Sequence, residues 1–121
     1  MSKIYEIPNN IHIHTAYGDF YRKMRDEGLI DQFHQLFTYA CLVGLKENNK
    51  SEDKKNNDIF QVHNIEDNNL KVVKGIALTM LDVDDGKELI EELIKYADGG
   101  IELLKKDYEN DRKLSLNKYI N

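Results

Sequence analysis

The chain has 121 residues, which is enough for one domain with a substantial core and too few for two ordinary domains. Apolar residues make up 40% and charged residues 32%, a balance that excludes the composition typical of disordered chains. Seventeen Lys and Arg against twenty-two Asp and Glu give a net charge of −5, which argues against a protein that coats nucleic acid non-specifically.

The amino-terminal segment, residues 3–14, alternates loosely between apolar and polar positions around Pro8-Asn9-Asn10. Its apolar residues are Ile4, Ile7, Ile11 and Ile13. This pattern predicts two short extended pieces joined by a turn, and so a short N-terminal β-hairpin.

Two helices are predicted next. From Ala16 to Glu27 the apolar residues fall at helical spacing, and Gly28 ends the segment. Asp31 is the expected N-cap of a second helix, which runs to about Lys46. Apolar residues lie on several faces of this second helix, so we expect it to form the centre of the core. Its inner stripe is Phe33, Leu36, Phe37, Ala40, Cys41 and Gly44.

Residues 46–58 contain no apolar side chain. The segment is expected to be a flexible, solvated polar loop inside the domain. Ile59, Phe60 and Val62 follow as a short extended patch that can attach the end of the loop to the core.

The last third of the chain is predicted to be helical. A third helix is expected from Asp67 to Leu81, with Gly75 available for a close helix crossing. Asp85 and Glu88 have the spacing of a capping box at the start of a fourth helix. Its heptad-like apolar phase continues through Gly99-Gly100 to Tyr108, which indicates either one kinked helix or two collinear ones. Residues 114–121 form a tail that can dock as a last turn or strand.

Together these elements predict a mainly α fold: a single domain over residues 1–121, built as a compact bundle of four to five helices with a short N-terminal β-hairpin. The lone cysteine, Cys41, excludes an intramolecular disulfide and is consistent with a reducing compartment. No apolar run is long enough for a membrane span and the first residues lack a signal-peptide pattern, so we expect a cytoplasmic protein without membrane contact.

The residues do not define a catalytic centre. His12 and His14 have the spacing of a metal pair on one strand face, with His34 or His63 as conceivable third ligands, but surface histidines are the favoured interpretation. Cys41 lies within an apolar stripe and is expected to be a small buried packing residue. No nucleotide-binding or hydrolase motif is found. We therefore expect no enzyme activity, no cofactor and no metal.

The basic residues form three small clusters, the last of which is Lys105-Lys106 with Arg112-Lys113 near the end. Arg22, Lys23 and Arg25 lie on the first helix, and Lys54 and Lys55 lie in the polar loop. They are the candidate residues for binding DNA or a partner, although solvated helix and loop surface is the default interpretation. Symmetric assembly of a homo-oligomer would align such cations into one stripe.

Three segments resemble the small proteins of bacterial DNA-phosphorothioation systems, DndE and the short Dnd system-associated proteins. They are residues 33–46, which end in Gly44-Leu45-Lys46; Lys74-Gly75-Ile76-Ala77-Leu78 after a short entry that contains Phe60; and residues 96–104, in which Gly99, Gly100 and Ile101 match the family's structural signature. With the variable polar loop, the resemblance covers about two thirds of the chain.

The resemblance implies a compact helical protein of a phage-defence locus, without an enzymatic centre, that assists the sulfur-modification or restriction machinery. We expect a non-enzymatic accessory subunit that acts through other proteins of the defence operon and through DNA contacts. The alternative is an oligomeric DNA-binding protein, nick-sensing or regulatory, that contacts double-stranded or nicked DNA. DndE is associated with such a role through surface lysines, and this sequence departs from it by its net acidity. A metal-dependent nuclease is the weakest alternative.

Overall fold

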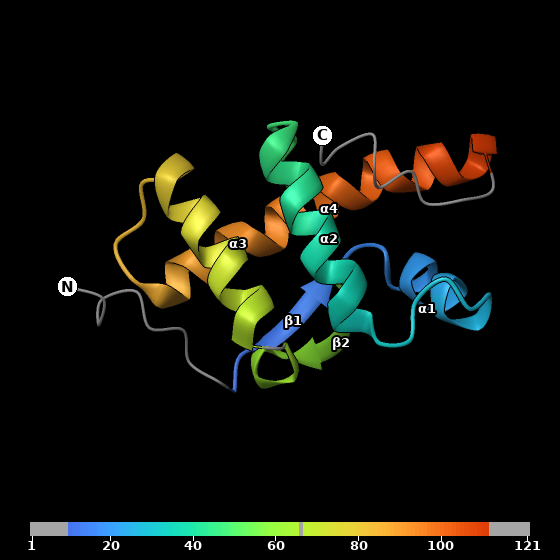
Figure 1. Ribbon diagram of the computed structural model, residues 1–121, viewed down its shortest axis with the longest axis horizontal. Coiled ribbons are helices and arrows are strands. Elements are labelled where there is room, and N and C mark those ends of the chain that lie inside the picture. Colours follow the sequence, from blue (N-terminus) through green and yellow to red (C-terminus); the bar gives the residue numbers. More distant parts are fainter. Residues whose placement is uncertain (1–9, 66, 112–121) are drawn as a thin grey trace.

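The computed structural model describes residues 10–65 and 67–111, and within them the chain is mainly helical (Figure 1). The predicted fold class is confirmed: four α-helices pack with a short antiparallel pair of strands. The predicted extended piece before residue 10 and the tail at 114–121 lie outside the described residues. In chain order the elements are β1 (His12–Thr15), α1 (Gly18–Asp26), α2 (Phe33–Lys46), β2 (Asn57–Gln61), the 3-10 turn η2 (Val62–Asn64), α3 (Asp67–Met80) and α4 (Gly86–Asp111).

Helices α2 and α4 cross at the centre of the molecule, with α3 on one side, α1 on the other and the two strands below the crossing, between α3 and α1 (Figure 1). The prediction that α2 forms the centre of the core is confirmed, because every residue of its inner stripe except Phe33 is buried. α4 supplies the facing side of the core through fully buried side chains. They are Leu89, Ile90, Leu93, Ile101 and Leu104.

Glycines let the two central helices approach each other closely. A Cβ atom on Gly44 would lie 1.9 Å from the carbonyl oxygen of Tyr96, and one on Gly100 would lie 2.0 Å from that of Ala40. A Cβ on Gly99 would meet the carbonyl oxygen of Asn49 at 1.9 Å. Any side chain at these three positions would therefore push backbone away from backbone.

The helix ends follow local sequence rules with one correction. Gly28 ends α1 with a φ of +77°, and Asp85 Oδ1 accepts a hydrogen bond from the Glu88 backbone N–H at the start of α4, as predicted. The N-cap of α2 is Gln32 and not Asp31. Gln35 Oε1 accepts hydrogen bonds from the backbone N–H groups of Asp31 and Gln32. The helix therefore begins one residue later than predicted. α4 is one continuous helix through Gly99-Gly100, which decides between the two predicted alternatives.

The strand pairing is long-range. β1 pairs with β2, the extended patch predicted around Ile59 and Phe60, which lies more than forty residues further along the chain. A register irregularity at Ile59 separates the pair Ile13–Phe60 from the pair His14–Asp58. Along β1, Ile13 and Thr15 are buried and face the core.

The predicted polar loop at 46–58 needs correction in its bounds. Lys46 ends α2, and Asn57 and Asp58 belong to β2. Between them most side chains are exposed to solvent, as the lack of apolar residues indicated. Polar groups also attach the segment to α4: the Ser51 backbone N–H donates to the Lys95 carbonyl at 3.0 Å, and Asn49 Nδ2 donates to the Gly99 carbonyl at 2.7 Å.

Candidate functional site

Asp98 of α4 is the centre of a buried polar cluster. Its side chain is 1% exposed and accepts hydrogen bonds from Thr15 Oγ1 and, at 2.9 Å, from the Ala16 backbone N–H. The ammonium of Lys55 lies 3.0 Å from the same carboxylate. Buried charges require such partners, so this cluster joins β1, the polar segment and α4 and fixes the chain where α1 begins.

The cluster gives Lys55 a structural role. Its side chain is 16% exposed and neutralises Asp98, and Lys55 Nζ also donates to the Ser51 carbonyl at 3.0 Å. Its positive charge is therefore used inside the protein. Lys54, its neighbour, is exposed to solvent.

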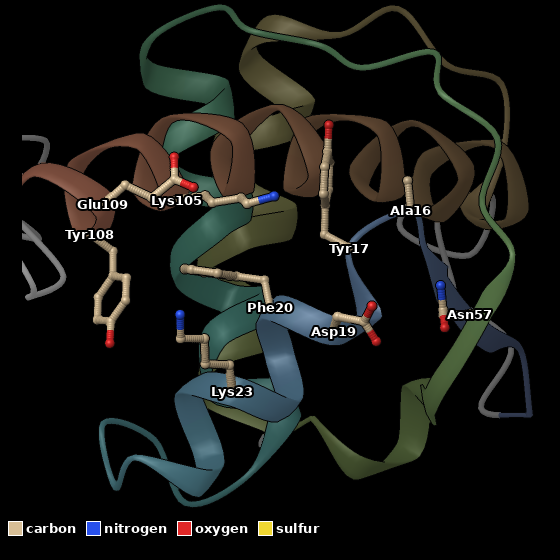
Figure 2. A pocket seen from close by; sticks show the side chains of 9 residues that line it. All are labelled: Ala16, Tyr17, Asp19, Phe20, Lys23, Asn57, Lys105, Tyr108 and Glu109. Atoms are coloured by element: carbon tan, nitrogen blue, oxygen red, sulfur yellow. The ribbon is translucent and has the colours of Figure 1, made fainter.

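A cleft of about 250 Å³ lies next to this cluster, between α1 and the carboxyl-terminal half of α4 (Figure 2). Aromatic side chains form much of its wall, and charged side chains from both helices stand around it. The lining residues are Ala16, Tyr17, Asp19, Phe20, Lys23, Asn57, Lys105, Tyr108 and Glu109.

Carboxylates outside the cleft hold the hydroxyls of its two tyrosines. The Tyr17 hydroxyl lies 2.8 Å from Glu102 Oε2 and 3.2 Å from Asp53 Oδ2, and the Tyr108 hydroxyl donates to Glu27. Burial, the hydrogen bond to Glu102 and the charges of both carboxylates raise the pKa of Tyr17 well above its ordinary value. The Tyr17 phenol therefore stays neutral at physiological pH.

Two lysines cover these tyrosine rings. Lys105 Nζ lies 5.7 Å from the ring centroid of Tyr17, and Lys23 Nζ lies 5.2 Å from that of Tyr108. Within residues 10–65 and 67–111, neither ammonium has a carboxylate oxygen within 4.0 Å. Figure 2 shows Lys105 extending from α4 and Lys23 from α1, with Phe20 between the two helices. The cleft thus combines aromatic surface with two cations that form no ion pair with the part of the chain that the structure describes.

The other predicted basic residues do not gather with Lys23. Arg22 pairs with Asp19 at 2.5 Å, and the guanidinium of Arg25 lies 4.3 Å above the ring of Phe33 on the α2 side. Of the five candidate residues, Lys23 alone lines the cleft. Arg22, Arg25 and Lys54 are exposed, and Gly99, Gly100 and Ile101 lie at the crossing with α2.

Sequence reasoning missed the part of the cleft that comes from α4. Tyr108 was interpreted only as part of an apolar stripe, and Lys105 only as part of a small basic cluster. Their heptad-like spacing gives no signal that they face α1, because the contact depends on how two distant segments cross. The neighbouring Lys105-Lys106 pair was the nearest available hint.

The histidines do not form a common site. His12 Nδ1 lies 2.7 Å from Asp58 Oδ2, and His34 packs edge-on against Phe60. Among the described residues, no three His, Cys, Asp or Glu side chains are placed to hold a metal ion.

Cys41 is a buried packing residue, as predicted. Its side chain is fully buried, and Sγ lies 3.6 Å from the Leu93 carbonyl oxygen. Burial and the charge of Asp98 raise the pKa of the thiol well above its ordinary value. Since the thiolate is the reactive form, this environment makes Cys41 unreactive.

Comparisons with protein-family models, curated proteins and solved structures found no match. In the part of the chain that the structure describes, no helix has both the length and the apolar character needed to cross a membrane.

Proposed function

We propose that this protein is a non-enzymatic accessory subunit that binds another protein chain by an acidic segment, in the cleft between α1 and α4. The observation that carries the proposal is the pair of ammonium groups, Lys23 and Lys105, held over Tyr108 and Tyr17 with no carboxylate partner among the described residues. A carboxylate entering the cleft would form charge-assisted hydrogen bonds to both lysines. The aromatic rings offer apolar surface to the neighbouring part of the same peptide.

The size and charge of the cleft favour a peptide over a duplex. A volume of about 250 Å³ accommodates one or two side chains. Asp19 and Glu109 also line the cleft and balance the two lysines, whereas binding a duplex needs several aligned cations without intervening acids. The remaining basic residues of α1 contact other side chains: Arg22 pairs with Asp19, and Arg25 lies over the ring of Phe33.

The biological setting proposed for this activity comes from the sequence resemblance. The segments that resemble phosphorothioation-system proteins include Gly44, Gly99 and Gly100, which build the crossing of α2 and α4. In this setting the partner is another protein of a bacterial anti-phage DNA-modification or restriction operon, in the cytoplasm. The subunit's role is to hold that partner and not to perform chemistry.

The direct test is an NMR titration of the labelled protein with a capped glutamate-rich peptide that contains one aromatic residue, and separately with intact and nicked duplexes. We expect the peptide to shift the resonances of Tyr17, Lys23, Lys105 and Tyr108. The double variant Lys23→Ser/Lys105→Ser should lose these shifts.

The matched control is Lys87→Ser/Lys106→Ser, which removes the same charge from exposed positions that do not line the cleft. It should bind the peptide like the wild type. Salt-sensitive binding of the duplexes without any response to the peptide would overturn the proposal and support the DNA-binding alternative.

A further inference from the structure

Helix α3 carries an apolar stripe that no other described element covers. Val72, Ile76 and Met80 follow one another at intervals of four residues and are 53%, 39% and 48% exposed. The adjacent side of the helix is packed into the core through Val73 and Ala77. Such an exposed row of large apolar side chains marks an interaction surface.

Gly75 lies beside this stripe, and no contact among the described residues requires a glycine there. A Cβ atom built on it would meet nothing within 4 Å, unlike one on Gly44 or Gly100. Glycine inside an exposed helix lowers helix stability by about 1 kcal/mol relative to alanine. The residue thus leaves room for another helix to approach closely, and none of the helices that the structure describes occupies that room.

The charges near α3 indicate which helix would fit there. Lys71 lies at the edge of the exposed face in the first half of the helix, and Asp82 lies just beyond the end of the helix, where it is exposed. A second α3 placed antiparallel about Ile76 would bring Lys71 of one copy toward Asp82 of the other. The antiparallel arrangement would also place the partly positive N-terminal end of each helix beside the partly negative C-terminal end of the other, which is favourable.

We infer that α3 is the interface of a symmetric dimer, in which two copies pair antiparallel through Val72, Ile76 and Met80 around a close approach at Gly75. The interface is isologous, so Val72 of one copy lies near Met80 of its partner and the two Ile76 side chains meet near the twofold axis. It lies on α3, away from the cleft between α1 and α4, so it stands independently of the proposed peptide binding.

Sedimentation equilibrium of the full chain tests the inference. We expect a mass twice the 14.2 kDa of one chain, falling to the single-chain value on dilution. Ile76→Glu should raise the dissociation constant by about tenfold or more, because it places two like charges at the twofold axis. Gly75→Leu should do the same without harming the fold, since the added Cβ has open space within its own chain.

Asn110→Glu is the matched control, because it adds the same charge at an exposed helical position on α4 and should leave the mass unchanged. Cross-linking gives the orientation: Ile76→Cys chains should link to each other with a short bismaleimide and Asn110→Cys chains should not, while the buried Cys41 stays silent. A wild-type chain that stays monomeric at all concentrations overturns the inference and leaves α3 to another occupant. So does a dimer that both Ile76→Glu and Gly75→Leu leave intact.

Discussion

The glycines at the crossing of α2 and α4 and the glycine on the outer face of α3 have opposite surroundings. At the crossing, Gly44, Gly99 and Gly100 each face backbone of a neighbouring segment at distances that no side chain would tolerate. On α3, Gly75 faces open space. The first region is complete within one chain, and its sequence is explained by packing. In the second, no described neighbour requires the glycine, and the inferred dimer accounts for it.

The largest expected effect is at the buried carboxylate of the crossing. Asp98→Ala should lower the free energy of unfolding by about 3–5 kcal/mol, because it leaves Lys55, Thr15 and the Ala16 N–H without their common partner. Urea denaturation measures the loss. Combining it with Lys55→Met should recover part of the stability, whereas a single variant within 1 kcal/mol of wild type would show that the cluster is not structural.

Gly100→Ala tests the closeness of the helix crossing. The added methyl would lie 2.0 Å from the Ala40 carbonyl oxygen, so the helices must separate, at a cost of about 1–3 kcal/mol or more. The same denaturation experiment measures it. An unchanged midpoint would mean that the crossing accommodates a side chain and that its glycines need another explanation.

Gly75→Ala should have the opposite sign. Because its Cβ meets nothing and alanine favours the helix, the variant should gain about 0.5–1 kcal/mol. The measurement belongs in the Ile76→Glu background, so that association does not contribute to the stability. A loss in that background would show that Gly75 has a structural role within its own chain.

The smallest effect is expected at the surface network of Glu92. Burial raises the pKa of this carboxyl, but the hydrogen bonds and charges of Lys50 and Lys95 outweigh it and lower the pKa overall. A lowered pKa means that the contribution to stability is present at neutral pH and is lost as the pH falls through the pKa of the folded state. Glu92→Gln should therefore cost less than about 1 kcal/mol at pH 7. The difference from wild type should shrink in acid, and a difference that grows in acid would contradict this assignment.

The sequence predicted the helices well because their signals are local. Apolar periodicity located all four, and Gly28 and the Asp85–Glu88 pair marked two of their ends. What it could not predict depends on tertiary contacts. The salt bridge between Lys55 and Asp98 attaches the polar segment to α4. The strand that pairs with β1 lies far along the chain.

The candidate site was predictable only in fragments for the same reason. Lys23 was singled out as a basic residue of a helix, but its role depends on Tyr108, which approaches it only through the packing of α1 against α4. Lys55 was singled out together with Lys23, but its charge neutralises the buried carboxylate of Asp98. No pattern within either segment indicates the other, because their contact is set by the fold.

The measurement that tests the account most directly is co-purification of the tagged protein with the products of its neighbouring genes, expressed together. We predict that one partner with an acidic segment elutes with the wild type and with Lys87→Glu/Lys106→Glu, but not with Lys23→Glu/Lys105→Glu, which reverses the same amount of charge in the cleft. Retention of the partner by the cleft variant, or recovery of the wild-type protein without any partner, would contradict the proposed function.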